Sequence, residues 1–217
     1  MRYRPLLKGL GITAFLWLFF VAYFHLLRHP ARTVFEMPLT ALDRAIDVQP
    51  AMLGAYVSLW LYVGIAPGLL LSVRELVTYG LWAAAMCLTG LLCFYLVPTA
   101  VPRLDLAIDL AQHPGFALLQ GVDAAGNACP SLHVAGALFS AIWIHRLLRD
   151  MGAPAITRTI NALWLVLIVY STLAVKQHVV LDVIGGVALA LLFGGASLRR
   201  FPRSATWPAG RVLQGGR

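Results

Sequence analysis

Charged side chains are scarce in this sequence, at 12% of its 217 residues. A water-soluble domain carries about 25% charged residues. Hydrophobic residues make up 60% of the chain, and its mean hydropathy is +0.79. The shortage of charge therefore excludes a water-soluble globular domain and predicts an integral membrane protein.

Cysteine is also rare, and Cys87, Cys93 and Cys129 form no pattern typical of a disulfide framework or a zinc site. No internal repeat is visible, which counts against a transporter built from inverted repeats. The net charge of +8 could indicate a nucleic-acid partner, but the basic residues do not gather in one soluble patch. We therefore expect the bilayer as partner and no nucleic acid, with the oligomeric state left open.

Six stretches are apolar enough, and close enough to the required length of about 20 residues, to cross a bilayer. They cover residues 9–27, 52–73, 76–97, 128–148, 156–175 and 179–198. We expect a hinge at Arg74 and Glu75, between the second and third stretches. The predicted fold is an all-α bundle of six transmembrane helices, with one domain over residues 1–200. Residues 201–217 are predicted to form a disordered cytoplasmic tail.

Lysine and arginine divide unevenly between the two sides of such a bundle. With the amino terminus in the cytoplasm, 12 of the 17 fall on the inner side and 5 on the outer side. Basic residues favour the cytoplasmic side of a membrane. We therefore expect a multi-pass protein of the bacterial inner membrane, with both termini in the cytoplasm and the active site facing outward.

A first group of chemically active residues precedes the last apolar stretch. His178 and Asp182 are four residues apart, and on a helix that spacing puts both on one face. The Asp182 carboxylate could then fix which nitrogen of the His178 ring carries the proton. A histidine held in this way is typical of a nucleophile or a general base.

A second group begins the fourth stretch, where Pro130 suits the first turn of a helix. Ser131 and the amides after it would then lie at a helix amino terminus, which is a ready site for an anion. His133 follows one turn into the helix and points near the same place. The alternative is an ordinary capped helix start with an incidental histidine.

Two basic residues on the outer side are candidate phosphate ligands. Arg103 follows the third stretch, and its planar guanidinium could bind phosphate through two hydrogen bonds. Lys176 lies two residues before His178, which favours an anion contact. For both residues the alternative is a role as an interfacial anchor.

The motif Pro-Ser-Leu-His at 130–133, followed by His178-x-x-x-Asp182 on a chain with six predicted spans, resembles the type 2 phosphatidic acid phosphatase superfamily. Its Ser-Leu-His and Lys-Gln-His-x-x-x-Asp elements are most similar to the branch of inositol phosphorylceramide synthase-like proteins. The resemblance covers roughly residues 94–186, and its topology extends to the whole chain.

The resemblance implies a role for each matching residue. His178 would attack phosphorus and form a phosphohistidine, while Asp182 orients its ring. His133 would protonate the leaving alcohol, and Ser131 with nearby amides would hold the phosphoryl oxygens. This division of labour fits phosphoryl transfer, which depends mainly on positioning and on neutralising oxygen charge. It requires no metal and no cofactor.

The chain also departs from the usual phosphatase pattern. Leu132 stands where the pattern has glycine, and Thr172 stands where it has an arginine six residues before the nucleophile. The first motif, Lys-x6-Arg-Pro, is not found. Our hypothesis is that Arg103 and Lys176 replace these missing cations.

The leading prediction is an enzyme that hydrolyses a lipid phosphate at the outer leaflet, such as a phosphatidic acid or a polyprenyl phosphate. A phosphotransferase that passes the phosphoryl head group to an alcohol is the alternative, since water and alcohol differ only in the second step. Two other classes stay open. One is a metal-dependent hydrolase using His133, His178 and Asp182, and the other is a non-catalytic transport or lipid-binding bundle.

Overall fold

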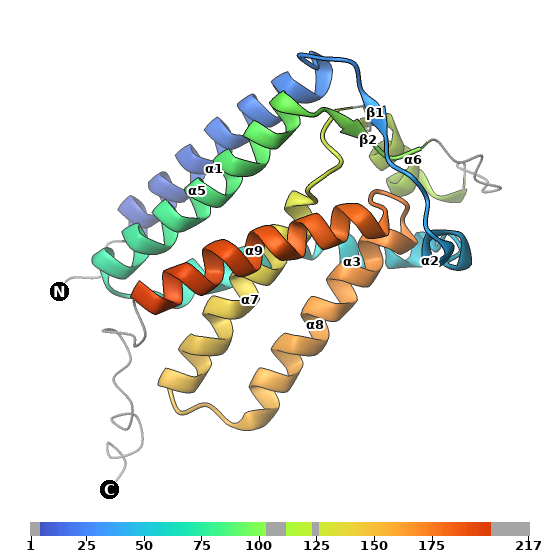
Figure 1. The fold of residues 1–217 in the computed structure, drawn as a ribbon. Coiled ribbons are helices and arrows are strands. Elements are labelled where there is room, and N and C mark those ends of the chain that lie inside the picture. The colour runs from blue at the N-terminus through green and yellow to red at the C-terminus, as the bar shows by residue number, and fades with distance from the viewer. Residues whose placement is uncertain (1–4, 103–111, 123–125, 201–217) are drawn as a thin grey trace, which may run out of the picture.

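The computed structural model describes residues 5–102, 112–122 and 126–200. Helices dominate these ranges, which confirms the all-α fold (Figure 1). In chain order the helices are α1 Pro5–Arg28, α2 Ala41–Ala45, the 3-10 helix η1 Pro50–Met52, α3 Leu53–Val57, α4 Leu59–Leu69, α5 Val73–Leu96, α6 Pro114–Val122, α7 Leu132–Asp150, α8 Ala155–Ala174 and α9 Val180–Arg200. Strands β1 (Phe35–Glu36) and β2 (Thr99–Ala100) form a single short parallel pair, with Phe35 opposite Thr99.

The long helices share two ends, which differ in what they carry. Figure 1 shows the start of α1 and the end of α9 at the same end of the bundle, together with the α7–α8 connection. The strand pair, α2 and α6 lie at the opposite end, together with the turn that connects α8 to α9. We refer to these as the terminus end and the loop end. Assignment of the terminus end to the cytoplasm remains a prediction.

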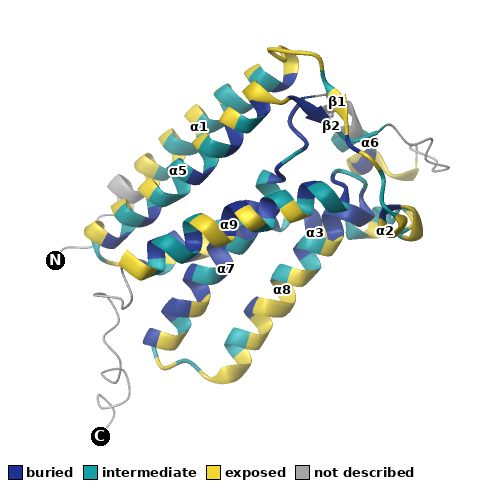
Figure 2. Cartoon of the chain, viewed as in Figure 1, coloured by how far each residue is buried: buried dark blue, intermediate teal, exposed yellow. Residues whose placement is uncertain are grey.

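Helix α7 forms the centre of the bundle and contacts α4, α5, α8 and α9. Its side chains are buried on several faces, whereas the outer face of α8 is largely exposed and the described side chains of α1 are mostly exposed or intermediate (Figure 2). Trp143, Phe139 and Ala135 of α7 belong to the main hydrophobic core. Exposed apolar side chains on the outer helices, such as Trp17 and Leu163, fit a surface that faces lipid.

Helix α7 ends in a compact turn that sends the chain back along α8. Gly152 has a φ of 70°, the left-handed conformation that glycine adopts at low cost. The Gly152 N–H donates to the Arg149 carbonyl at 3.0 Å, and the Ala153 N–H donates to the Leu148 carbonyl at 2.9 Å. This pair of bonds is the Schellman arrangement, which satisfies carbonyls at the end of a helix.

Five helical segments of the described chain are long and apolar enough to cross a membrane. They are Gly9–Arg28, Pro50–Leu69, Val73–Leu96, Ala155–Ala174 and Val180–Arg200. Helix α7 is not among them, since its last turns hold Arg146, Arg149 and Asp150. A sixth span through α7 therefore remains a prediction, which its central position between the other helices supports.

The second predicted stretch and its hinge differ from the structure. The segment is divided into η1, α3 and α4, and the chain leaves helical geometry at Leu70 rather than at Arg74. Glu75 lies in the first turn of α5, where it is only 5% exposed. The sequence alone does not predict this burial, because a buried acid needs a partner. That partner, Arg146, is 71 positions away.

Candidate active site

The turn between α8 and α9 presents His178 at the loop end of the bundle. The N–H groups of Gln177 and His178 both donate to the Thr172 carbonyl, at 3.1 and 3.2 Å, which folds the chain tightly after α8. His178 lies in this turn, two residues before α9 begins. The expectation that His178 and Asp182 share one helix is therefore wrong, because the helix starts only at Val180.

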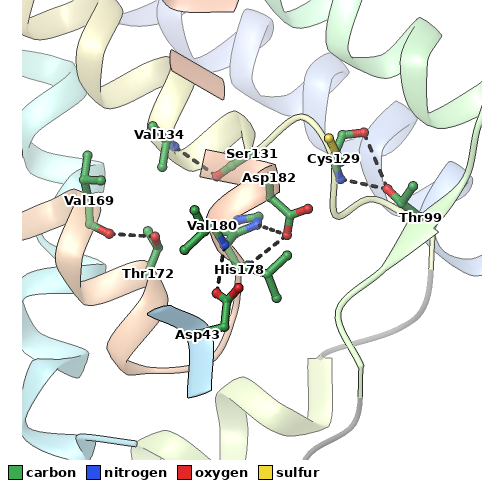
Figure 3. Close-up of polar contacts among 11 residues, drawn as sticks. Asp43, Thr99, Cys129, Ser131, Val134, Val169, Thr172, His178, Val180 and Asp182 are labelled. Carbon is green, nitrogen blue, oxygen red and sulfur yellow. Dashed lines mark hydrogen bonds and ion pairs between the residues drawn. The ribbon is translucent and has the colours of Figure 1, made fainter. Parts of the chain in front are cut away.

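Asp182 nevertheless faces the His178 ring from the first turn of α9. Its Oδ2 lies 3.5 Å from Nδ1 of His178 and accepts a hydrogen bond from the Val179 N–H at 3.0 Å (Figure 3). Asp182 is fully buried and His178 is 8% exposed. With Nδ1 turned toward the carboxylate, Nε2 is the ring nitrogen left to react with a substrate.

Ser131 joins the start of α7 to the start of α9. Its N–H donates to the Asp182 carbonyl at 2.9 Å, and its Oγ accepts from the Val134 N–H at 3.2 Å as the amino-terminal cap of α7. The close approach depends on Gly186, since a side chain there would collide with the Ser131 carbonyl. Ser131 is fully buried and does not face outward as the sequence suggested, because this contact with α9 covers it.

His133 lies beside His178 in an aromatic setting. The centroids of the two imidazole rings are 5.7 Å apart. Tyr56 stacks on the His133 ring at 4.6 Å, and Trp60 meets it edge-on at 5.6 Å. Nε2 of His133 is buried and has no hydrogen-bond partner among the described residues. The two histidines that the sequence placed in separate helical segments are thus neighbours.

Lys176, an expected phosphate ligand, makes hydrogen bonds to the backbone of the α2 segment. Its ammonium donates to the backbone carbonyl of Asp43 at 2.9 Å and also to the carbonyl of Ile46. The side chain therefore ties the α8–α9 turn to the segment around α2. Arg103, the other expected phosphate ligand, lies outside the described residues, as does the predicted tail at 201–217.

Asp43 was not singled out from the sequence, yet it belongs to the surroundings of His178. Its Oδ1 accepts from the Val180 N–H at 2.9 Å (Figure 3). Its Oδ2 accepts from the Thr40 N–H at 2.8 Å. The pattern of Thr40 followed by an acid three residues later is a capping-box signal. It could have revealed helix α2, but not the contact with α9.

Leu132, which departs from the family pattern, has a matching glycine on a neighbouring helix. A side chain at Gly90 of α5 would collide with the Leu132 side chain. The absence of a side chain at Gly90 therefore makes room for Leu132 beside the site. No group of three metal-binding side chains is found within the described ranges.

An apolar cavity of about 780 Å³ lies between α1, α4, α5 and α7, and His133 is one of its lining residues. Its lining includes Phe20, Leu59, Val63, Met86, Leu132 and Phe139. Gln177 lies on the wall as well, so the cavity borders the turn that carries His178. A cavity of this volume is within the range of ligand pockets, and its lining suits a hydrocarbon chain.

Comparison with known proteins gives one family. A model of the PAP2 superfamily matches residues 25–196, which include Asp43, Ser131, His133, His178 and Asp182. No curated protein matches the chain. No solved structure matches it either. The chain therefore belongs to the PAP2 superfamily, and its membership supports a phosphatase-type function in phosphoryl transfer.

Proposed function

We propose that the protein is a membrane-embedded phosphatase that hydrolyses a lipid phosphate through a phosphohistidine at His178. The observation that carries this proposal is the pair of neighbouring imidazoles, with ring centroids 5.7 Å apart, of which the His133 ring lines an apolar cavity. Two rings this close can contact the same phosphoryl group from opposite sides. The cavity supports a lipid, since its lining can accept the hydrocarbon part of a substrate whose phosphate reaches the histidines.

In the first step, the Nε2 lone pair of His178 forms a bond to phosphorus. The bond between phosphorus and the ester oxygen breaks, its electron pair stays on that oxygen, and a proton from His133 converts the leaving group to an alcohol. Asp182 holds the Nδ1 proton and stabilises the positive ring as it forms. The unpartnered Nε2 of His133 supports its assignment as the proton donor.

In the second step, His133 takes a proton from water, and the water oxygen forms a bond to phosphorus. The bond between phosphorus and nitrogen breaks, and its electron pair returns to His178. Inorganic phosphate leaves, and His133 is protonated again. Each step follows the pattern of general acid–base catalysis, which contributes about 10²–10⁴-fold to a rate.

The phosphoryl oxygens need hydrogen-bond donors. The first amides of a helix have no acceptor within it, and in α7 those of Ser131 and Val134 are already bonded. The amides of Leu132 and His133 are the remaining candidates, with Arg103 as the proposed cationic ligand. Helix amino termini are suited to phosphate for this reason.

Transfer to an alcohol is the second candidate. Its support is the burial of the nucleophile, since His178 is only 8% exposed, together with the similarity of the motifs to inositol phosphorylceramide synthase-like proteins. A shielded nucleophile limits the access of water and so favours an acceptor that arrives with the lipid.

Phosphate release by the detergent-purified protein tests both candidates. Dioctanoyl phosphatidic acid and farnesyl phosphate serve as substrates, with glycerol phosphate as a water-soluble comparison. We expect His178→Ala and His133→Ala each to lower the rate at least about a hundredfold. His145→Ala is the matched control, because His145 is exposed near the other end of α7. Full activity of His178→Ala would refute the proposal.

Two additions separate the remaining classes. A long-chain alcohol added to the assay should leave free phosphate as the main product, whereas an excess of the phosphorylated alcohol would favour the transferase. A chelator should leave the rate of phosphate release unchanged. A fall in that rate on addition of the chelator would favour the metal-dependent hydrolase.

A further inference from the structure

The segment between α1 and η1 is bonded to the turn that carries His178. The Asp43 carboxylate accepts from the Val180 N–H at 2.9 Å, and the Lys176 ammonium donates to the Asp43 carbonyl at 2.9 Å. Further along, the Gln49 N–H donates to the Ala174 carbonyl at 2.8 Å. These bonds hold the turn both before and after His178, across more than 120 positions of sequence.

The Asp43 carboxylate is itself held rigidly. Its Oδ2 accepts from the Thr40 N–H at 2.8 Å and from the Thr40 hydroxyl at 2.7 Å. Its Oδ1 accepts from the Val180 N–H. The residue is 6% exposed. Both oxygens therefore have fixed partners, and movement of the carboxylate would break bonds within α2 as well as the bond to α9.

Lys176 adds a conformational constraint. It is a non-glycine residue with a φ of 59°, a strained conformation that persists when the surroundings enforce it. The two carbonyls that receive its ammonium, those of Asp43 and Ile46, supply that enforcement. An ammonium held in this way has a structural partner in place of a substrate phosphate.

The two amides that follow His178 are both occupied by carboxylates. Val179 donates to Asp182 at 3.0 Å and Val180 donates to Asp43 at 2.9 Å. The amides of Val179 and Val180 are thus bonded to protein carboxylates, and these bonds fix the backbone directly after His178.

We infer that Asp43 and Lys176 are positioning residues for the His178 nucleophile, and that they hold the α8–α9 turn in its reactive geometry from the α2 segment. The inference rests on the proposed function of His178. It also replaces the expectation that Lys176 binds phosphate. A shift of the nucleophile by about 1 Å is enough to lower a rate about a hundredfold, so loss of either tie acts on the chemical step.

Steady-state kinetics on dioctanoyl phosphatidic acid provide the test, with Asp43→Ala, Lys176→Met and the double variant. We expect each single variant to lower kcat about 10- to 100-fold and to change KM less than about threefold. The double variant should be close to the slower single variant, since both changes release the same turn. Arg44→Ala is the matched control, because Arg44 is the exposed neighbour of Asp43 on α2.

The phosphate-ligand role gives a different result. If Lys176 binds phosphate, Lys176→Met raises KM and weakens inhibition by orthovanadate, and its effect multiplies with that of Asp43→Ala. That outcome, or unchanged kcat in both single variants, would overturn the inference.

The folded fraction of each variant is measured by size-exclusion chromatography and thermal unfolding. Should Asp43→Ala not fold, Thr40→Val removes only the hydroxyl that holds the carboxylate, and a several-fold fall in kcat is then expected. An unchanged kcat in folded Thr40→Val and Lys176→Met would overturn the inference equally.

The rate of phosphoenzyme formation, followed by rapid quench with radiolabelled substrate, separates this inference from the proposed function. Loss of the phosphoenzyme only in His178→Ala, with normal rates in Asp43→Ala and Lys176→Met, would refute the positioning role alone. Full activity in His178→Ala would refute the proposed function itself.

Discussion

Helix α7 carries buried polar side chains at both of its ends, and their partners differ. At the terminus end, Arg146 is 2% exposed and lies 3.5 Å from Glu75 and 3.9 Å from Asp150. Its guanidinium also lies 4.4 Å from the ring of Trp143. At the loop end, one carboxylate, Asp182, faces His178, and Nε2 of His133 has no partner among the described residues.

This difference in partners indicates that the terminus end of α7 stabilises the fold and that the loop end carries the chemistry. A buried charge needs compensating partners, and removing one of them is strongly destabilising. The Arg146 group has such partners on α5 and α7, so it joins these helices. A buried group without a partner lowers stability, and is retained where a substrate supplies the missing contact. By this comparison, substitutions at the terminus end should affect folding, and substitutions at the loop end should affect rate.

Arg146→Met is expected to have the largest effect on stability. It removes the buried guanidinium that lies between Glu75 and Asp150, and breaking a buried ion pair costs about 3–5 kcal/mol. Denaturant titration in mixed micelles measures the loss of unfolding free energy. The folded fraction should keep its kcat, and a tenfold fall in kcat would show that the two ends are not independent.

His133→Phe should give the opposite result. The phenyl ring can keep the stacking on Tyr56 and removes the unsatisfied nitrogen, whose burial costs about 1–3 kcal/mol. We expect unfolding free energy to stay constant or rise, while phosphate release falls at least about a hundredfold. A variant that is both inactive and clearly less stable would contradict this account of the loop end.

Gly186→Ala tests the contact between α7 and α9 that brings the histidine segments together. The added methyl group collides with the Ser131 carbonyl, and overpacking of this kind costs about 1–3 kcal/mol. Gly195→Ala on the same helix is the matched control, since nothing lies within 4 Å of its added carbon. Equal thermal stability of the two variants would mean that α7 and α9 adjust freely.

Arg149→Ala should have the smallest effect. Arg149 lies 3.9 Å from Asp150, but its side chain is 63% exposed, and exposed ion pairs contribute about 0–1 kcal/mol. We expect a loss below about 0.5 kcal/mol in the titration used for Arg146→Met. A loss as large as that of Arg146→Met would show that burial does not distinguish the two arginines.

The sequence was sufficient to predict the long helices α1, α5, α7, α8 and α9, because a run of about 20 apolar residues has few other uses. It also identified His133, His178 and Asp182 as candidate catalytic residues, through residue types and spacing. The activity of the variants described above tests whether these residues catalyse the proposed reaction. The predicted topology put both histidines on the outer side, and the resemblance to a known family put them in one site, although 45 positions separate them.

The remaining features depend on contacts between distant segments. The bond from Val180 to Asp43 joins positions 137 apart, and no local pattern predicts it. Arg146 could be counted among the basic residues near the cytoplasm, but its burial depends on Glu75 of α5. The room for Leu132 likewise comes from Gly90, on a helix whose packing the sequence alone does not give.

Asp182 has two separate tasks at one position. Its carboxylate faces the His178 ring, and its backbone carbonyl accepts from the Ser131 N–H at 2.9 Å. A side-chain replacement leaves that carbonyl in place, so it changes the charge beside His178 and the bond from the Val179 N–H but not the backbone bond between α7 and α9. A redesigned side chain at this position therefore needs an acceptor for Val179, whereas the bond from Ser131 makes no demand on the side chain.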